Sequence, residues 1–500
     1  MNEVTTMVTA SPALSYRSGR GRWVLAATVG GSAIASIDAT VVGIALPAIG
    51  RDFHTGLAAL QWVVTAYTLT LAGLLLAAGA LGDRYGRRRV FEIGVIWFAL
   101  ASLLCCLAPS APMLIGARAL QGVGAALLTP GSLAILEAVF VPQDRGRAIG
   151  AWSGLSGVAS AVGPFVGGWF VQAVSWRLIF AINLPIAVAV VAVARRHVPE
   201  SRDPQAAGRV DLLGGAMVTL GLVALTYGLI QGSPLGWGSP PVLAALGLGV
   251  VMLLGFTGWE HRVRTPILPL HLFASAQFSA ANLVTFVVYG ALGGALFLLP
   301  ITLQQVSGYT PLQAGISLLP VTAIMLAFAA RSGALAARVG PRLQMSLGPV
   351  LVGAGLALFT RIAASGDYLT QVLPAVTVLG FGLATTVAPL TATVLAAVAA
   401  QHAGVASAVN NAVARTAALI AVAVLPAAAG ITGTAWLHPA QFAAGFHTAA
   451  VICAVLCAAA GGLAAVTVRN SAERADPPLR HLAATLTVDS TLAAERSRTI

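Results

Sequence analysis

Gly79-Ala-Leu-Gly-Asp-Arg-Tyr-Gly-Arg-Arg-Arg89 is a short, basic, glycine-rich stretch between two long apolar segments. A weaker copy, Gly333-Ala-Leu-Ala-Ala-Arg-Val-Gly-Pro-Arg342, lies between two other apolar segments in the second half of the chain. The copy keeps the Gly-Ala-Leu start, the arginine five residues after the first glycine, and the glycine and arginine that follow. The same basic hinge, used twice between hydrophobic segments, predicts a membrane protein with two related halves.

Composition places most of the chain in a membrane. Hydrophobic residues make up 58% of the 500 residues and charged residues only 9%, with a mean hydropathy of +0.87. Soluble domains carry about 25% charged residues. Apolar runs of about 20 residues can cross a hydrocarbon core about 30 Å thick as helices, whereas the alternation typical of barrel strands is absent. We therefore predict an all-α membrane protein with many spans.

The apolar pattern predicts fourteen transmembrane helices, flanked by polar, basic tails at 1–22 and 469–500. The expected spans are 23–47, 59–80, 91–109, 112–137, 148–171, 177–194, 211–231, 241–258, 278–301, 311–331, 343–361, 369–394, 405–430 and 445–467.

Arginine placement gives the expected orientation. All 28 basic residues are arginine, and with the N-terminus inside, 23 of them fall in the tails and even-numbered loops. Only Arg51, Arg177 and Arg361 fall in the other loops. This asymmetry predicts that both termini are cytoplasmic. Because the basic residues follow the helix ends, the net charge of +12 does not indicate nucleic-acid binding.

The absence of lysine limits the energy sources and the chemistry that the protein could use. A Walker-type ATP site needs its lysine, and so does Schiff-base chemistry on lysine. We therefore expect no ATP hydrolysis of this kind, and the driving force would be a gradient or another subunit. As a transporter driven by a proton gradient, the protein is expected to have no enzyme activity, no cofactor and no metal. The four cysteines lie in apolar spans, where buried packing is the expected role.

The positions of the two hinges predict how the helices are grouped. Gly79 ends the second span, whereas Gly333 ends the tenth. Two six-helix halves would put the copy at the eighth span, so two extra helices must separate the halves. The predicted 6+2+6 arrangement has an N-terminal bundle at 23–196, linkers with two extra helices at 197–276, and a C-terminal bundle at 277–468.

The motifs resemble those of the major facilitator superfamily, specifically its fourteen-helix drug:proton antiporters. Besides the loop 2–3 stretch, the segments that carry the resemblance are Ile37–Pro47 in span 1, Leu114–Gly124 in span 4, Gly150 with Gly163–Gly168 in span 5, and Trp176–Pro185 in span 6. The resemblance implies the major facilitator fold and antiport with protons. Two positions depart from the pattern. Ala159 replaces a glycine of the span 5 signature, and Ala337 replaces the acid in the second hinge, which implies a gate dominated by the first half.

Asp38 is the only acid well inside a predicted span. A carboxyl group there is costly and rarely accidental, and burial favours its protonated form, so it can take up and release a proton. Arg118 lies at a similar depth and needs a partner, for which Asp38 is the candidate; Gln121, one turn away, would extend the polar path. A structural ion pair without a transport role is the alternative. In the resembled family, the matching acid and arginine are associated with proton coupling or substrate binding.

The loop 2–3 motif is expected to act mechanically. Gly79, Gly82 and Gly86 allow a tight turn and close approach of helices. Asp83 would accept hydrogen bonds at a helix N-terminus or pair with an arginine, latching this side shut.

The arginines of this loop have two candidate roles. Arg84, Arg87 and Arg88 are expected to pair with Glu137 or Asp144 at the inner end of span 4, as a possible charge relay. The alternative is that they only set the topology.

The span 5 signature comprises Gly150, Gly163, Pro164, Gly167 and Gly168. The proline removes one backbone hydrogen bond and the glycines remove bulk from one face, which permits a bend and close packing. The resemblance implies a gating bend that limits leakage, since this signature marks exporters; pure packing is the alternative.

These observations predict a proton-coupled exporter in the cytoplasmic membrane, acting on small hydrophobic or amphipathic and possibly cationic drugs or antibiotics. Its partners would be the lipid bilayer, protons and the substrate. Export of an endogenous metabolite, such as a self-made antibiotic, a siderophore or an amino acid, remains open. A receptor or scaffold that has kept the fold is the alternative from another class.

Overall fold

The computed structural model describes residues 14–202, 211–263, 266–399, 402–433 and 435–470. Within these ranges the protein is all-helical, and a single bridge between Leu14 and Phe140 is the only extended pairing. Most of the predicted tails at 1–22 and 469–500 lies outside the described residues. Residues 203–210 of the predicted linker lie outside them too.

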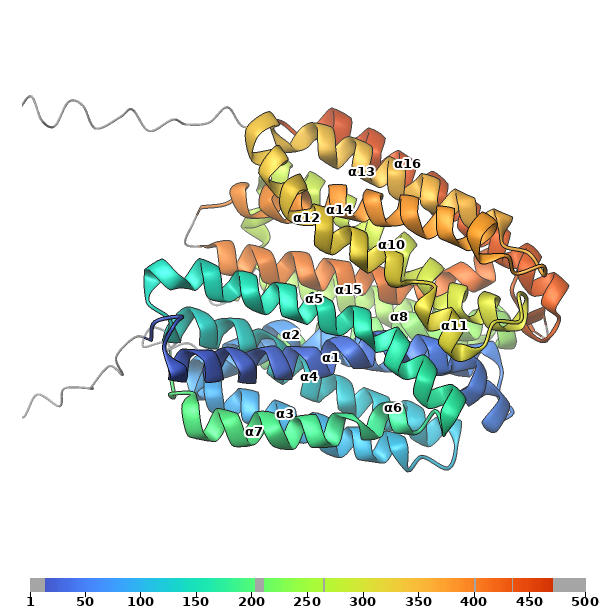
Figure 1. Ribbon diagram of the computed structural model, residues 1–500. Coiled ribbons are helices and arrows are strands. Elements are labelled where there is room, and N and C mark those ends of the chain that lie inside the picture. Colours follow the sequence, from blue (N-terminus) through green and yellow to red (C-terminus); the bar gives the residue numbers. More distant parts are fainter. Residues whose placement is uncertain (1–13, 203–210, 264–265, 400–401, 434, 471–500) are drawn as a thin grey trace, which may run out of the picture.

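The α-helices, shown in Figure 1, have the following bounds: α1 Gly19–Asp52, α2 Leu57–Tyr85, α3 Arg87–Cys106, α4 Ala111–Val139, α5 Pro142–Ala173, α6 Leu178–Ala181, α7 Asn183–His197, α8 Leu212–Leu235, α9 Pro240–Glu260, α10 Ala276–Gln305, α11 Pro311–Ile316, α12 Leu319–Val339, α13 Pro341–Leu358, α14 Leu373–Ala396, α15 Ala403–Ala428 and α16 Pro439–Thr467. Short 3-10 turns span Leu270–Ala274, Phe359–Arg361 and Ala435–Leu437, and a π-helical turn spans Tyr368–Val372.

The described residues contain fourteen helical segments that are long and apolar enough to cross a membrane, which confirms the predicted number. Two segments are broken helices, α6–α7 and α11–α12. Each break precedes a proline that lacks the N–H for a carbonyl four residues earlier. Pro185 leaves the carbonyl of Ala181 without its helical donor, and Pro320 does the same for Ile316.

Several helices run beyond their predicted ranges because their polar end turns continue the helical hydrogen bonding. The first helix begins at Gly19 instead of residue 23, where the hydroxyl of Ser18 accepts a hydrogen bond from the Gly21 N–H at 3.0 Å. The second continues to Tyr85 and ends at Gly86, whose φ of +115° suits glycine. Hydropathy detects the apolar middle of a span but not such polar end turns.

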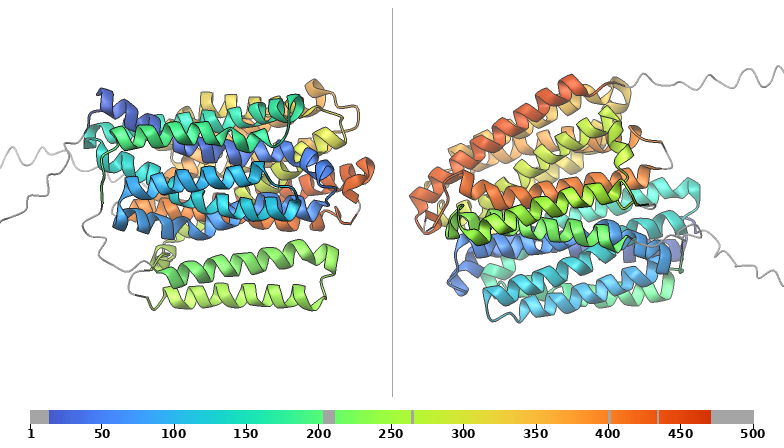
Figure 2. Two further views of the ribbon diagram at one scale, coloured as in Figure 1. Left: turned by 90° about the horizontal axis from the view of Figure 1, so that it is seen from below. Right: turned by 180° about the vertical axis from the view of Figure 1, so that it is seen from behind.

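The helices form two groups and a separate hairpin. Helices α1–α7 pack among themselves, as do α10–α16 (Figure 1). Helices α8 and α9 pack against each other, and Figure 2 shows this pair set to one side of the groups. Helix α8 contacts α2 of the first group and α15 of the second, where Leu222 packs with Leu69 and Leu419.

The two groups meet at one end of the molecule. We call the end where α2 joins α3 at Gly86 the loop 2–3 end, and the end where α1 joins α2 the opposite end. At the opposite end one hydrophobic core runs through both groups. Gln61 Nε2 donates to the Val422 carbonyl across the groups at 2.7 Å, and Gln304 Nε2 donates to the Ile44 carbonyl at 3.0 Å.

At the loop 2–3 end the arrangement differs. The buried cluster of the first group, formed by the loop 2–3 portions of α1 to α5 and α7, contains no residue of the second group. Between α2, α4 and α15 lies a cavity of about 570 Å³. The structure is therefore closed at the opposite end and hollowed at the loop 2–3 end.

The close contact of α2 with α4 yields a first prediction. A Cβ on Gly122 would overlap the Thr70 hydroxyl and the Tyr67 carbonyl, whereas a Cβ on Gly116 of the same helix would meet open space. Overpacking typically costs about 1–3 kcal/mol. We expect Gly122→Ala to lower the melting temperature of the purified protein in detergent by several degrees and Gly116→Ala to leave it unchanged or slightly raised. Equal melting temperatures for the two variants would contradict this packing.

Candidate functional site

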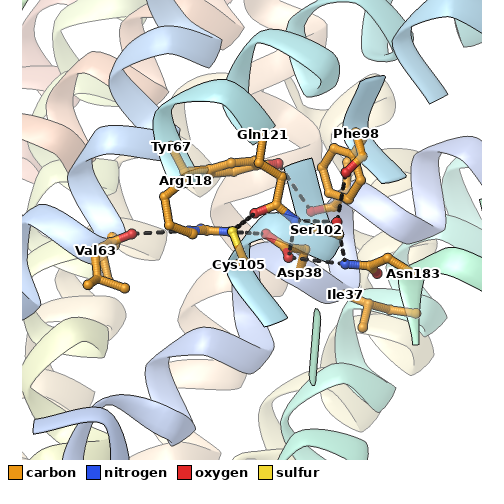
Figure 3. A network of polar contacts seen from close by, with 12 residues as sticks. Ile37, Asp38, Val63, Tyr67, Phe98, Ser102, Cys105, Arg118, Gln121 and Asn183 are labelled. Carbon is orange, nitrogen blue, oxygen red and sulfur yellow. Dashed lines mark hydrogen bonds and ion pairs between the residues drawn. The ribbon is translucent and has the colours of Figure 1, made fainter. Parts of the chain in front are cut away.

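A buried ion pair lies in the first group of helices. Asp38 of α1 is 0% exposed and Arg118 of α4 is 1% exposed, and a guanidinium Nη1 of Arg118 contacts the Asp38 carboxylate directly (Figure 3). Asp38 lies in the middle of α1, and Arg118 lies two turns into α4 from the opposite end. The structure thus brings together the two residues expected to pair.

Amide groups complete the shell around the Asp38 carboxylate. Gln121 Nε2 donates to Asp38 Oδ1 at 2.8 Å, and Asn183 Nδ2 donates to the same oxygen at 3.3 Å. Both amides also donate to the Ser102 hydroxyl, at 2.8 and 3.2 Å. A buried charge is tolerated only when paired and hydrogen-bonded, and α1, α3, α4 and α7 together supply that environment.

Arg118 is held from several sides. Its Nε donates to the Val63 carbonyl of α2 at 3.1 Å, and its Nη1 donates to Gln121 Oε1 at 2.6 Å. The guanidinium carbon lies 4.3 Å from the centre of the Tyr67 ring, close enough for a cation–π contact. Because arginine keeps its proton in proteins, the Asp38 carboxyl is the group in this ion pair whose charge can change.

Sequence reasoning missed part of this site. Asn183 lies within the Trp176–Pro185 motif, but its position there predicts no particular role. Ser102 carried no signal, since a serine in an apolar helix usually bonds only to its own backbone. Tyr67 is 3% exposed, and its ring packs against the Arg118 guanidinium, a contact that no sequence motif indicated. Distances between helices that are far apart in the sequence decide these roles.

The loop 2–3 motif forms a compact charged turn. Asp83 at the end of α2 and Arg87 at the start of α3 form an ion pair at 2.8 Å across the break at Gly86. The Glu200 carboxylate, which follows α7, accepts hydrogen bonds from the backbone N–H groups of Arg88 and Arg89 at 3.1 and 3.3 Å. An acid at a helix N-terminus is favourable because free N–H groups point toward it. Glu200 therefore caps α3, a role that the sequence analysis did not assign.

The expected ion pairs of Arg87 and Arg88 with Glu137 or Asp144 are absent from the described residues, although Arg87 Nη1 donates to the Ala134 carbonyl of α4 at 3.4 Å. Arg88 instead lies 3.5 Å from Glu92 and 3.9 Å from Glu200. Asp144 accepts from the Tyr16 N–H at 2.8 Å and from the Ser15 hydroxyl at 3.2 Å, so it anchors the segment before α1. Glu137 lines the cavity. The prediction failed because neighbours along the helix and the chain after α7 are closer partners.

The span 5 glycines fall into two classes. Gly163 packs against Thr40 of α1, and Gly167 packs against Val41 of the same helix. A Cβ added to either glycine would overlap its neighbour on α1. Gly168 packs against the backbone of Pro311 in the second group, whereas Gly150 faces open space.

The proline of this motif takes part in the same contact between groups. The Pro164 carbonyl lies against Gly315 of α11, leaving no room for a Cβ there. The part of the motif near the opposite end is therefore a joint between the two groups of helices.

The cavity is reached from the loop 2–3 end. Its lining includes Gly79, Gly82, Asp83 and Arg84 of the motif, with side chains of α4 and α15. Its deepest α2 residue is Leu75, two turns short of Tyr67. Asp38 does not line it, so the carboxylate is sealed from the cavity in this conformation. The described residues contain no group of three or more His, Cys, Asp or Glu side chains that could hold a metal ion.

Comparison with known proteins places the chain in a family. The family model described as Major Facilitator Superfamily matches residues 28–422. The chain is 35% identical over 458 residues to the methylenomycin A resistance protein of Bacillus subtilis, covering 90% of this chain and 97% of that protein. It is 36% identical over 430 residues to the puromycin resistance protein pur8 of Streptomyces alboniger, with 85% and 84% covered. It is 35% identical over 402 residues to the multidrug resistance protein Stp of Mycobacterium tuberculosis, with 80% and 74% covered.

Solved structures share the fold. A bacterial homologue of the human lysosomal transporter Spinster superposes with a TM-score of 0.63 at 16% identity, covering 90% of this chain and 96% of that one. A POT family transporter in complex with a thioalcohol-conjugated peptide gives 0.65 at 11% identity, covering 87% and 94%. With its fourteen membrane segments, this multi-pass chain is a membrane transporter rather than an enzyme, and it belongs to the major facilitator superfamily.

Proposed function

We propose that the protein is a proton-coupled antiporter that exports hydrophobic or amphipathic drugs or antibiotics across the cytoplasmic membrane and so confers resistance. The observation that carries the proposal is the Asp38–Arg118 pair, a titratable group sealed in the first group of helices. The relatives' names support the substrate class, since they refer to methylenomycin A, puromycin and multidrug resistance.

The chemistry of the pair suits a coupling role. When the Asp38 carboxylate takes up a proton, its charge is lost and the attraction to Arg118 weakens. Arg118 then keeps the Val63 carbonyl, the Gln121 amide oxygen and the Tyr67 ring as partners. Because these partners belong to α2 and α4, protonation would loosen α1 from its neighbours without leaving the guanidinium bare. In this scheme one proton moves inward as one substrate molecule moves outward.

The proposed cycle alternates between the two ends. The loop 2–3 end carries most of the arginines, so the positive-inside rule supports a cytoplasmic position for it and for both termini. The described conformation would then be open to the cytoplasm, ready to load substrate. We propose that the helices are organised as 6+2+6, with α8 and α9 as the added pair. The gradient supplies the energy, without ATP or a cofactor.

The coupling role of Asp38 can be tested in everted membrane vesicles energised by respiration. We expect drug addition to collapse part of the pH gradient with the natural chain, and Asp38→Asn to abolish that response. Asp52→Asn is the matched control, because Asp52 lies at the end of the same helix and pairs with Arg177 at 2.8 Å near the surface. A full response from Asp38→Asn would remove Asp38 from the proton path.

Stability measurements separate this effect from misfolding. Removing one partner of a buried pair costs about 3–5 kcal/mol, so Asp38→Asn is expected to lower the melting temperature. In the double variant Asp38→Asn/Arg118→Gln both charges are removed, and we expect much of the stability to return without any return of proton movement. Recovery of proton movement in the double variant would assign the pair a purely structural role.

The joint between the groups yields a prediction for the conformational change. In Gly168→Ala the new methyl group would lie 2.5 Å from the Pro311 carbonyl oxygen, which forces the groups apart at the opposite end. We expect the variant to favour the conformation open at that end. Gly150→Ala, which meets open space on the same helix, should have no such effect.

A reporter cysteine measures this shift. Ala423→Cys, in a chain whose four natural cysteines are replaced, places a thiol where α15 meets Gln61 and where only 1% of the side chain is exposed. Labelling by a membrane-impermeant maleimide should become several-fold faster with Gly168→Ala and stay unchanged with Gly150→Ala. Equal rates in both would show that this joint does not hold the opposite end closed.

A further inference from the structure

Arg415 lies in the middle of α15 and is the charged residue that the proton-coupling scheme does not use. A charged side chain at the centre of a membrane span is costly and marks a functional site by default. Arg415 is half-buried, and its Nε donates to the Asn411 amide oxygen at 3.0 Å. Among the described residues, no acid forms an ion pair with it and no other hydrogen bond to its side chain is present.

The helical spacing places Arg415 on the face of α15 that lines the cavity. Gly404, Ala408 and Asn411 are lining residues. Arg415 follows them at the same spacing of three and four residues, which keeps it on one helix face. It lies one turn, or about 6 Å, deeper than Asn411. Its Nε bonds to Asn411, which lines the cavity, so its guanidinium lies next to the inner end of the α15 lining.

Apolar packing one turn beyond Arg415 closes the inner end of the cavity. One turn further along α15, Leu419 is 1% exposed and packs with Leu69 and Leu222. Helices α2 and α15 run antiparallel, and Gln61 bonds to the Val422 carbonyl, so this register places Arg415 level with Tyr67. Tyr67 is thus level with Arg415 of α15 and in contact with Arg118 of α4, which packs on its ring.

The two ends of the cavity differ in their charged side chains. Near the loop 2–3 end, acids and arginines are mixed, and the pair Asp83–Arg87 is already neutralised internally. At the inner end the charge is the guanidinium of Arg415. A cationic compound moving inward would be repelled there, whereas an anionic group would replace the missing acid. A guanidinium also offers paired N–H donors whose geometry matches a carboxylate.

We propose that Arg415 binds the ionised acidic group of the exported compound, so that the substrates are amphipathic anions rather than cations. The inference rests on the proposed export function and names the substrate class for it. The apolar body of the compound would lie against the aliphatic side chains of α2 and α4 that line the cavity, such as Leu75, Leu127 and Leu133. The acidic group would form a forked pair with the two Nη atoms of Arg415, while Asn411 holds Nε.

Coupling follows from the position of Tyr67, which contacts Arg118 and is level with Arg415. An anion at Arg415 and a proton at Asp38 would both be bound near this residue, so occupation of either site changes the field at the other. Exchange of one proton moving inward for one anion moving outward is electrically equivalent to moving two positive charges inward. The export of an anion would therefore be accelerated by the membrane potential, whereas one-for-one exchange of a proton for a cation would move no net charge.

Binding of three matched probes tests the substrate class without requiring transport. The probes share a naphthalene body: 1-naphthaleneacetate is an anion, 1-naphthaleneacetamide is neutral, and 1-(aminomethyl)naphthalene is a cation at pH 7. Equilibrium dialysis with the purified full chain in detergent should show the tightest binding for the anion. We expect Arg415→Gln to raise its Kd about tenfold or more and to leave the neutral probe unchanged. Arg415→Lys, which keeps the charge but loses the fork, should give a smaller rise.

Arg331→Gln is the matched control, because Arg331 is an exposed arginine of α12 that bonds to its own helix. Thermal unfolding confirms that each variant is folded. The proposal is overturned if the natural chain binds the anion no better than the other probes, or if Arg415→Gln leaves anion binding intact.

Proton movement in vesicles distinguishes this result from the broader function. Selective anion binding that Arg415→Gln removes, with no probe-driven proton movement, would support the binding site and count against proton antiport. Proton movement driven by the cation alone, unchanged in Arg415→Gln, would overturn the anion site and leave antiport standing.

Discussion

An aspartate and an arginine held together away from water impose the main constraint on the first group of helices. Neither charge is tolerable alone at that depth, so α1 and α4 must stay in register for the pair to exist. Gln121 and Asn183 donate further hydrogen bonds to the carboxylate, and a backbone carbonyl of α2 accepts one from the guanidinium. Four helices are therefore tied to one carboxylate, and a change in its protonation acts on all of them together.

The two ends of the molecule are built differently, and the difference follows from packing. At the opposite end the glycines of α5 and the broken helix α11 let backbones approach within contact distance, and one apolar core joins both groups. At the loop 2–3 end the first group closes its own core, and charged residues of α2 and α3 border the cavity. Apolar packing and the hydrogen bonds of Gln61 and Gln304 hold one end, whereas charged side chains border the cavity at the other.

Much of this architecture can be predicted from the sequence, because a membrane requires long apolar helices and tolerates few buried charges. The number of spans followed from runs of apolar residues, and the Asp38–Arg118 contact followed from the scarcity of deep charges. Partners that depend on distances between helices were not predictable. Ser102 and Asn183 are neutral and give no pattern, and Glu200 reaches α3 only because the chain after α7 returns to it. The predicted partners of Arg87 and Arg88 were wrong for the same reason, since arginines are long and several acids lie within reach.

The hairpin of α8 and α9 makes the two sides of the bundle unequal. Where α2 meets α15, Leu222 of α8 covers the seam with an additional apolar layer. Where α5 meets α11 and α12, the contact is made by helices whose surfaces are mostly exposed, and no further helix covers it among the described residues. A lipid-soluble molecule diffusing in the plane of the bilayer thus meets a shielded flank on one side and a thin wall on the other. At the α5–α12 contact such a molecule meets the two groups directly, whereas at the α2–α15 contact it first meets α8.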